Sequence, residues 1–196
     1  MKLDRITRIA VAAALAATLT AYAGFKIPVL FPGFLKVDLG DAPALLVASV
    51  LGFGAGFWVE LVKVLLHLFL RGGDLVSLMA NLVAGTAFLL PMVFVRRPLP
   101  TRRNLWLPLL LAPFAAALIM IPANGIAFLP YHGILGAKAW SMAIYTLGPF
   151  NLLKFGISAL SVYLLLPFLA PVLGSLAAAG SAPSGRLRTS GAKGGD

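Results

Sequence analysis

Five long apolar runs constrain the fold of this chain more than any other feature of its sequence. They cover residues 9–23, 42–70, 75–95, 105–121 and 150–173. Of the 196 residues, 60% are hydrophobic and only 11% are charged, which is too apolar for a soluble domain of this length. A helix of about 20 apolar residues spans the hydrocarbon core of a bilayer. The sequence therefore predicts an all-α, polytopic membrane protein.

Basic residues gather at the ends of these runs and set the expected topology. The formal net charge is +10, and the basic segments 2–8, 96–103 and 186–193 should all lie on the cytoplasmic side. The first two segments share a side only if an even number of spans separates them. Glycines between residues 52 and 56 interrupt the run 42–70, so we expect two short helices there, each of ~13–15 residues. The prediction is six transmembrane helices, with both termini in the cytoplasm.

The two ends and the external connections complete this outline. Residues 1–174 should form the transmembrane domain, and the Gly-, Ser- and Ala-rich residues 175–196 a disordered cytoplasmic tail. Residues 25–40 and 124–147 are expected as long external loops. The phrase Ala21-Tyr22-Ala23 is similar to a secretory cleavage site, which leaves a cleaved signal as the alternative to a retained first helix.

Several kinds of chemistry are disfavoured by the composition. The chain has no cysteine, so disulfides and thiolate metal sites are excluded, and its two histidines lie far apart in sequence. Phosphate-binding loops, zinc-protease motifs and Ser/His/Asp sets are absent from the sequence. We therefore expect no catalytic residues, no metal and no cofactor. Any energy for transport would have to come from another polypeptide.

Lys154 and Asn151 are the strongest candidates for a ligand site. Lys154 lies in an apolar run that carries no carboxylate, and an amine at membrane depth costs several kcal/mol unless it has a partner. Asn151 precedes it by three residues, so both side chains share a helix face. Pairing of Lys154 with Glu60 or Asp41 is the alternative, but we favour contact with a polar ligand.

Further polar residues at membrane depth are weaker candidates. Glu60, Lys63 and His67 share one helix face, and an internal Glu60–Lys63 pair is the favoured interpretation, with contact to a ligand as the alternative. Asn81 and Asn124 could contact a ligand or bond across helices. The predicted binding set consists of Asn124, Asn151, Lys154, Asn81, Glu60 and Lys63.

Alanines on the first helix suggest a surface for a neighbouring helix. Ala12 and Ala16, and likewise Ala13 and Ala17, are spaced four residues apart, which allows close helix approach. In so alanine-rich a run this spacing is common. The four alanines are nevertheless a candidate docking face.

Four phrases together resemble the substrate-binding S-components of energy-coupling-factor (ECF) transporters. They are Phe34-Leu35-Lys36-Val37-Asp38-Leu39-Gly40-Asp41, Gly56-Phe57-Trp58-Val59-Glu60-Leu61-Val62-Lys63, Ala80-Asn81-Leu82-Val83-Ala84-Gly85 and Asn151-Leu152-Leu153-Lys154. Their order and spacing cover the chain from about residue 5 to residue 173 and favour the riboflavin-specific branch of that family.

This resemblance implies a function and its partners. It implies a cell-membrane protein that binds riboflavin at the external face as the transported ligand. A transmembrane coupling subunit and two cytoplasmic ATPases would complete the importer, with the alanine face of the first helix as the docking surface. The family's polar ligand contacts correspond to Asn124, Asn151 and Lys154.

Three other interpretations remain open from the sequence. The chain could be an S-component for another vitamin, such as thiamine or biotin. It could be an intramembrane enzyme that uses Glu60 and His67 as an acid–base pair, although no second carboxylate or nucleophile accompanies them. It could also be a scaffold subunit without a ligand.

Overall fold

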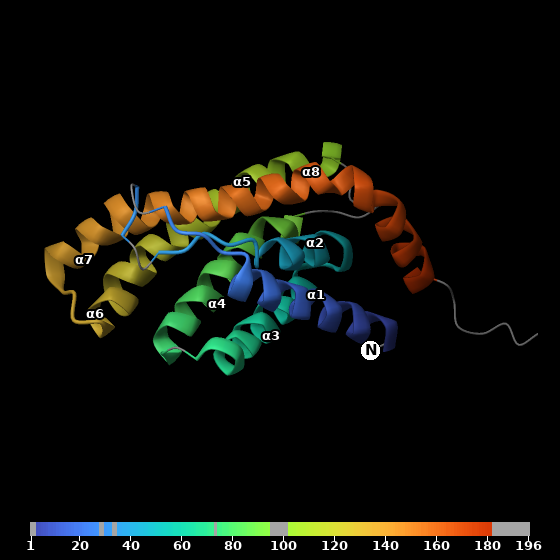
Figure 1. Cartoon of the computed structure of the whole chain (residues 1–196). Coiled ribbons are helices and arrows are strands. Elements are labelled where there is room, and N and C mark those ends of the chain that lie inside the picture. Colours follow the sequence, from blue (N-terminus) through green and yellow to red (C-terminus); the bar gives the residue numbers. More distant parts are fainter. Residues whose placement is uncertain (1–2, 28–29, 33–34, 73, 95–101, 182–196) are drawn as a thin grey trace, which may run out of the picture.

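Helices packed side by side form the fold, as the computed structural model shows for residues 3–27, 30–32, 35–72, 74–94 and 102–181 (Figure 1). In this part of the chain the only extended pairing is an isolated antiparallel bridge between Phe25 and Val37. The prediction of an all-α fold is confirmed.

Within the described residues, the helical elements join into six continuous segments. In chain order they are α1 (Leu3–Tyr22); α2 (Ala42–Leu51); α3 (Phe53–Arg71); α4 (Leu75–Leu89) with the 3₁₀ turn η1 (Leu90–Phe94); α5 (Arg102–Ala123) with the π-helical η2 (Asn124–Phe128) and α6 (Leu129–Tyr131); and α7 (Gly136–Met142) with the π-helical η3 (Ala143–Leu147) and α8 (Gly148–Ser181). Four of these segments are long and apolar enough to cross a membrane, and α1 and α2 are shorter apolar helices.

The predicted break in the run 42–70 is present, but it falls at one residue. Gly52 has a φ of 92°, a backbone conformation that favours glycine, and it separates α2 from α3. Only α2 is short, with 10 residues, whereas α3 has 19. The expectation of two short helices is therefore wrong for α3, because Gly54 and Gly56 stay helical inside it.

The segment 124–147 is mostly helical rather than the predicted long loop. The π-helical segments η2 and η3 continue α5 and precede α8, and the reversal is confined to the few residues around Gly133 and Gly136. Both glycines have positive φ, of 81° and 60°, which suits a tight reversal. At the other end, α8 continues to Ser181, past the predicted start of the tail, through the helix-favouring run Leu176-Ala177-Ala178-Ala179. The remainder of the predicted tail lies outside the described residues.

The core lies where α1, α2 and α3 meet α4, α5 and α8. Small side chains on α1 and α2 let these helices approach α3 closely, and larger ones such as Leu45, Phe88 and Phe155 fill the centre. Helices α5 and α8 run alongside each other over much of their length (Figure 1). At the start of α4, the Asp74 carboxylate accepts a hydrogen bond from the Ser77 amide at 2.8 Å, and bonding to Ser77 lowers the pKa of Asp74.

Close packing of α2 on α3 predicts a position-specific effect of glycine replacement. A Cβ atom at Gly56 would lie 2.6 Å from Ala48 Cβ and 2.8 Å from the Ala44 carbonyl oxygen, whereas one at Gly54 would meet nothing within 4 Å. We expect G56A to lower the free energy of unfolding by about 1–3 kcal/mol through overpacking. G54A should be neutral or slightly stabilising, because alanine favours a helix. SDS-induced unfolding followed by circular dichroism measures both, and equal stability of the two variants would contradict this packing.

Candidate ligand-binding site

A cavity of about 620 Å³ collects polar side chains from several helices. Its charged and polar lining comes from α1, the segment before α2, and helices α3, α4, α5–α6 and α8: Thr20, Lys36, Asp38, His67, Ser77, Asn81, Asn124, His132, Asn151 and Lys154. The volume is in the range of pockets that hold small molecules. Apolar side chains complete the wall: Leu35, Val76, Ala80, Ala84, Met120, Phe128, Leu129, Ile134, Met142, Leu147 and Phe150.

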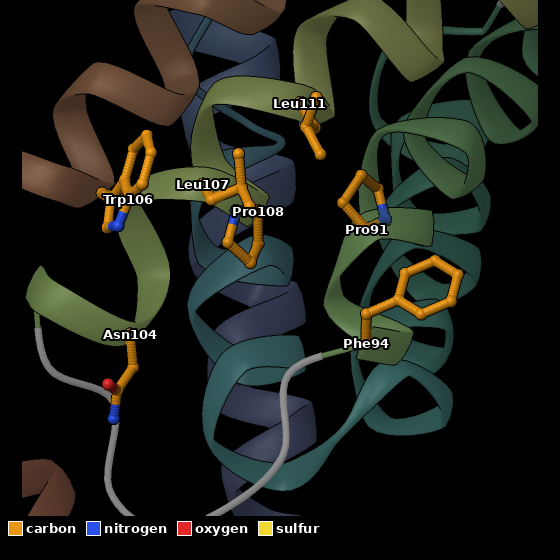
Figure 2. A pocket seen from close by; sticks show the side chains of 7 residues that line it. All are labelled: Pro91, Phe94, Asn104, Trp106, Leu107, Pro108 and Leu111. Carbon is orange, nitrogen blue, oxygen red and sulfur yellow. The ribbon is translucent and has the colours of Figure 1, made fainter.

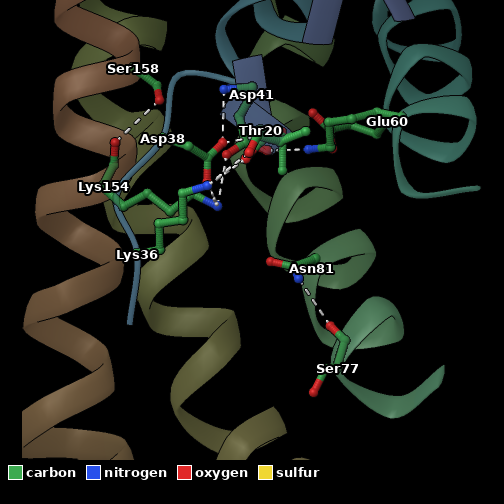
Figure 3. A network of polar contacts seen from close by, with 12 residues as sticks. Thr20, Lys36, Asp38, Asp41, Glu60, Ser77, Asn81, Lys154 and Ser158 are labelled. Atoms are coloured by element: carbon green, nitrogen blue, oxygen red, sulfur yellow. Dashed lines mark hydrogen bonds and ion pairs between the residues drawn. The ribbon is translucent and has the colours of Figure 1, made fainter. Parts of the chain in front are cut away.

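Lys154 is held at the wall of this cavity by two carboxylates from another part of the chain (Figure 3). Its Nζ lies 3.1 Å from Asp41 Oδ2 and 3.5 Å from Asp38 Oδ2, and the residue is 8% exposed. The Phe155 ring centroid lies 5.2 Å from the same nitrogen, within cation–π range. Pairing with Asp41, which the sequence left as the alternative, is therefore present, and the amine still borders the cavity.

A second lysine extends this pair into a buried ion cluster. Lys63 Nζ contacts both Asp41 Oδ1 and Glu60 Oε2, and all three side chains are buried. Asp41 thus lies between the two lysines. We name Asp38, Asp41, Glu60, Lys63 and Lys154 the ion cluster. Because a buried charge is tolerated only when it is paired, the cluster fixes α8 against α2 and α3.

Asp38 joins the ion cluster to the end of α1. Its Oδ1 accepts hydrogen bonds from the Gly40 amide at 2.9 Å and from Thr20 Oγ1 at 3.2 Å. Lys36 Nζ donates to the Thr20 and Ala21 carbonyl oxygens at 3.0 and 3.3 Å, which satisfies acceptors that the helix end leaves open. The segment before α2 is therefore fastened to α1 on one side and to Lys154 on the other.

Asn124 and Asn151 supply amides at the same cavity. Both are buried and line it, and no hydrogen bond between described residues involves either side chain. Asn124 begins the π-helical segment η2, and such segments often occur at functional sites. Next to it, a Cβ atom at Gly125 would lie 2.9 Å from Trp140 Cε3, so the glycine lets the Trp140 ring pack closely.

The other residues predicted from the sequence divide into two groups. Asn81 and His67 both line the cavity. The Asn81 Nδ2 donates a hydrogen bond to the Ser77 carbonyl oxygen at 3.1 Å. Glu60 and Lys63 do not line it, and their predicted internal pair is present. Sequence reasoning assigned no ligand contact to the cavity residues Thr20, Lys36, Asp38 and Phe150. Of these four, Asp38 is the residue that the sequence could most readily have indicated, since it is one of two carboxylates beside α2.

The structure places the predicted docking alanines mainly in the interior. Ala13, Ala16 and Ala17 are buried, where α1 packs against α3 and α2, and Ala12 is half-buried. Small side chains serve close packing within the chain as well as between chains. Among the described side chains of α1, the exposed alanines are instead Ala10 and Ala14, next to the exposed Val11 and Leu15.

These features define a helical membrane protein with an internal cavity of small-molecule size, and comparison with known proteins identifies the family. Residues 4–166 match the family described as ECF transporter, substrate-specific component. The chain belongs to this family of transporter components, whose members are not enzymes. It is therefore one part of a larger transporter.

The proteins similar to the chain include two curated transporters and a solved S component. Riboflavin transporter FmnP of Bacillus subtilis (strain 168) is 33% identical over 63% of this chain and 70% of its own length. Riboflavin transporter RibU of Staphylococcus aureus (strain TCH60) is 32% identical over 83% of this chain and 87% of its own length. A solved S component of a bacterial ECF transporter superposes with a TM-score of 0.73 and 30% identity, covering 86% of this chain and 96% of that one.

The ion cluster predicts a large stability effect at Asp41. In D41N, the ion pairs of Lys63 with Glu60 and of Lys154 with Asp38 remain, but the carboxylate between the two ammonium groups is lost. We expect the free energy of unfolding to fall by about 3–5 kcal/mol. D74N is the matched control, because Asp74 is exposed and asparagine caps a helix as well as aspartate does. A D41N variant as stable as D74N in SDS-induced unfolding would show that the cluster does not stabilise the fold.

Proposed function

We propose that this chain is the riboflavin-binding S-component of an ECF importer, and that riboflavin is its transported ligand rather than a cofactor. The observation that carries the proposal is the convergence of Asn124, Asn151 and Lys154 on one cavity, whose wall also includes eleven apolar side chains. The two curated riboflavin transporters, each identical to the chain at about a third of the aligned residues, support the same choice of vitamin.

The chemistry of the cavity suits a flavin. Riboflavin has a flat, mostly apolar ring system, a pyrimidine edge with alternating donors and acceptors, and a hydroxylated side chain. An asparagine amide both donates and accepts, so Asn124 or Asn151 can bond to such an edge. The Lys154 ammonium donates to carbonyl or hydroxyl oxygens. Phe128, Phe150 and Met120 offer apolar surface for the ring.

The ion cluster prepares Lys154 for this role. An unpaired flexible lysine would lose side-chain freedom on binding, which weakens affinity. Here Asp41 and Asp38 already fix the ammonium group at the cavity wall. An ammonium group has three donors, so one or more can point toward a ligand while others face the carboxylates.

The proposed importer places the chain in the cell membrane with three further subunits. A transmembrane coupling subunit and two cytoplasmic ATPases would supply the energy step, because the sequence of this chain has no nucleotide-binding motif. The outer face of α1, with Ala10 and Ala14 exposed, offers a small-residue surface on which a helix of the coupling subunit could pack closely.

Replacement of Lys154 tests the ligand site. K154M preserves roughly the length of the side chain and removes its charge. In this variant Asp41 still forms its ion pair with Lys63, and Asp38 still accepts hydrogen bonds from Thr20 and Gly40. We expect the dissociation constant for riboflavin to rise about 10- to 100-fold, because the ligand loses one hydrogen bond from a charged donor. Quenching of riboflavin fluorescence by purified protein measures it.

The matched control is K138M, which removes the charge of an exposed lysine on α7 outside the cavity. It should bind riboflavin like the unchanged protein. N151A should weaken binding as K154M does. If wild-type protein binds riboflavin but neither cavity variant is weaker than K138M, the site lies elsewhere; if wild-type protein binds thiamine or biotin instead, the choice of vitamin fails.

Replacement of Ala14 tests the docking face. A14W places a bulky ring on the exposed side of α1, so we expect reduced co-purification of the coupling subunit and reduced uptake, with riboflavin binding unchanged. L118W is the control, because Leu118 is also exposed but lies on α5. Assembly that survives A14W as well as it survives L118W would remove this face from the interface.

A further inference from the structure

Two apolar grooves meet at Trp106, near the start of α5, away from the polar cavity. The first, between η1 and α5, has a volume of about 540 Å³ and includes Pro91, Phe94 and Leu111 (Figure 2). The second, between α5 and α8, has a volume of about 450 Å³ and includes Phe114 and Gly156. Trp106 lines both grooves, and none of the described lining residues is acidic.

Both grooves are graded from polar to apolar along α5. Asn104 lies at the rim of the η1–α5 groove, and the exposed Arg103 precedes it. Trp106 and Tyr163 follow at the same end of the α5–α8 groove, as aromatic residues do at a membrane interface. From Trp106 to Phe114 the α5–α8 groove runs for about 12 Å along the helix, which is close to half of the hydrocarbon thickness.

The sequence that leads to the polar end is strongly basic. The sequence from Phe94 to Asn104 holds Arg96, Arg97, Arg102 and Arg103 and no acidic residue. Of these side chains the structure describes Arg103, which is exposed. Basic groups beside a groove between transmembrane helices attract anionic lipid head groups.

We propose that these grooves bind one anionic phospholipid with two acyl chains. The phosphate-bearing head group lies at Arg103 and Asn104, one acyl chain lies in the η1–α5 groove, and the other lies in the α5–α8 groove. Trp106 separates the two chains. This site is independent of the vitamin cavity, with which it shares no lining residue.

Gly156 gives the α5–α8 groove its depth and offers a direct way to fill it. A Cβ atom there would meet nothing within 4 Å, so a larger side chain would occupy the groove without a clash inside the protein. Gly54 on α3 has the same open surroundings and lies in neither groove, which makes it a matched control.

Quenching of Trp106 fluorescence by brominated lipids tests the proposal. The chain has three tryptophans, so W58F/W140F leaves Trp106 as the reporter. The protein is reconstituted in phosphatidylcholine vesicles that contain a small fraction of phosphatidylglycerol or phosphatidylcholine brominated on its acyl chains. We expect the site to prefer phosphatidylglycerol over phosphatidylcholine by roughly fivefold for each cationic side chain that the head group contacts.

Two variants in the same background separate the head-group and acyl-chain contacts. R103Q should remove much of the preference for phosphatidylglycerol, whereas K138Q, at the α7 end, should keep it. G156L should reduce quenching by either lipid, and G54L should not. Circular dichroism confirms that each variant is folded. Equal quenching of the reporter by the two lipids, or a preference unchanged by R103Q, would overturn the proposal.

Discussion

The ion pair of Lys154 with Asp41 is the interaction on which the rest of the structure depends. A charge inside an apolar bundle is costly unless an opposite charge lies beside it, so each member of the ion cluster needs an oppositely charged neighbour. Asp41 serves two lysines, one from α3 and one from α8, and Asp38 brings in the end of α1. The cost of burying these groups therefore specifies how distant parts of the chain pack together.

The same requirement shapes the polar cavity. Because the carboxylates of Asp41 and Asp38 set its position, the Lys154 ammonium group borders the cavity in a fixed orientation rather than as a mobile charge. Asn151 lies one turn earlier on α8, and Asn124 approaches from η2. Polar groups in such a pocket orient a ligand, and the apolar side chains contribute contact area. This combination suits the flavin that we propose as the ligand.

Much of this arrangement could be predicted from the sequence, and the errors have physical causes. Hydropathy and the charge pattern gave the all-α fold and the break near Gly52, since membrane helices have to be long and apolar. The unpaired appearance of Lys154 pointed to a site, but its partners, Asp38 and Asp41, lie more than a hundred residues away in sequence. The segment 124–147 was predicted as a loop rather than a helix because its polar residues are typical of loops. Small-residue spacing on α1 could not show which of its faces turns inward, since alanine suits both.

The identity of the small molecule that the protein retains tests the central claim most directly. The protein would be purified in mild detergent from cells grown with riboflavin, thiamine and biotin together, and the released ligand identified by mass spectrometry. The account predicts riboflavin, close to one molecule per chain in the wild-type protein. Recovery of another vitamin, or of none from protein that is folded, would contradict it.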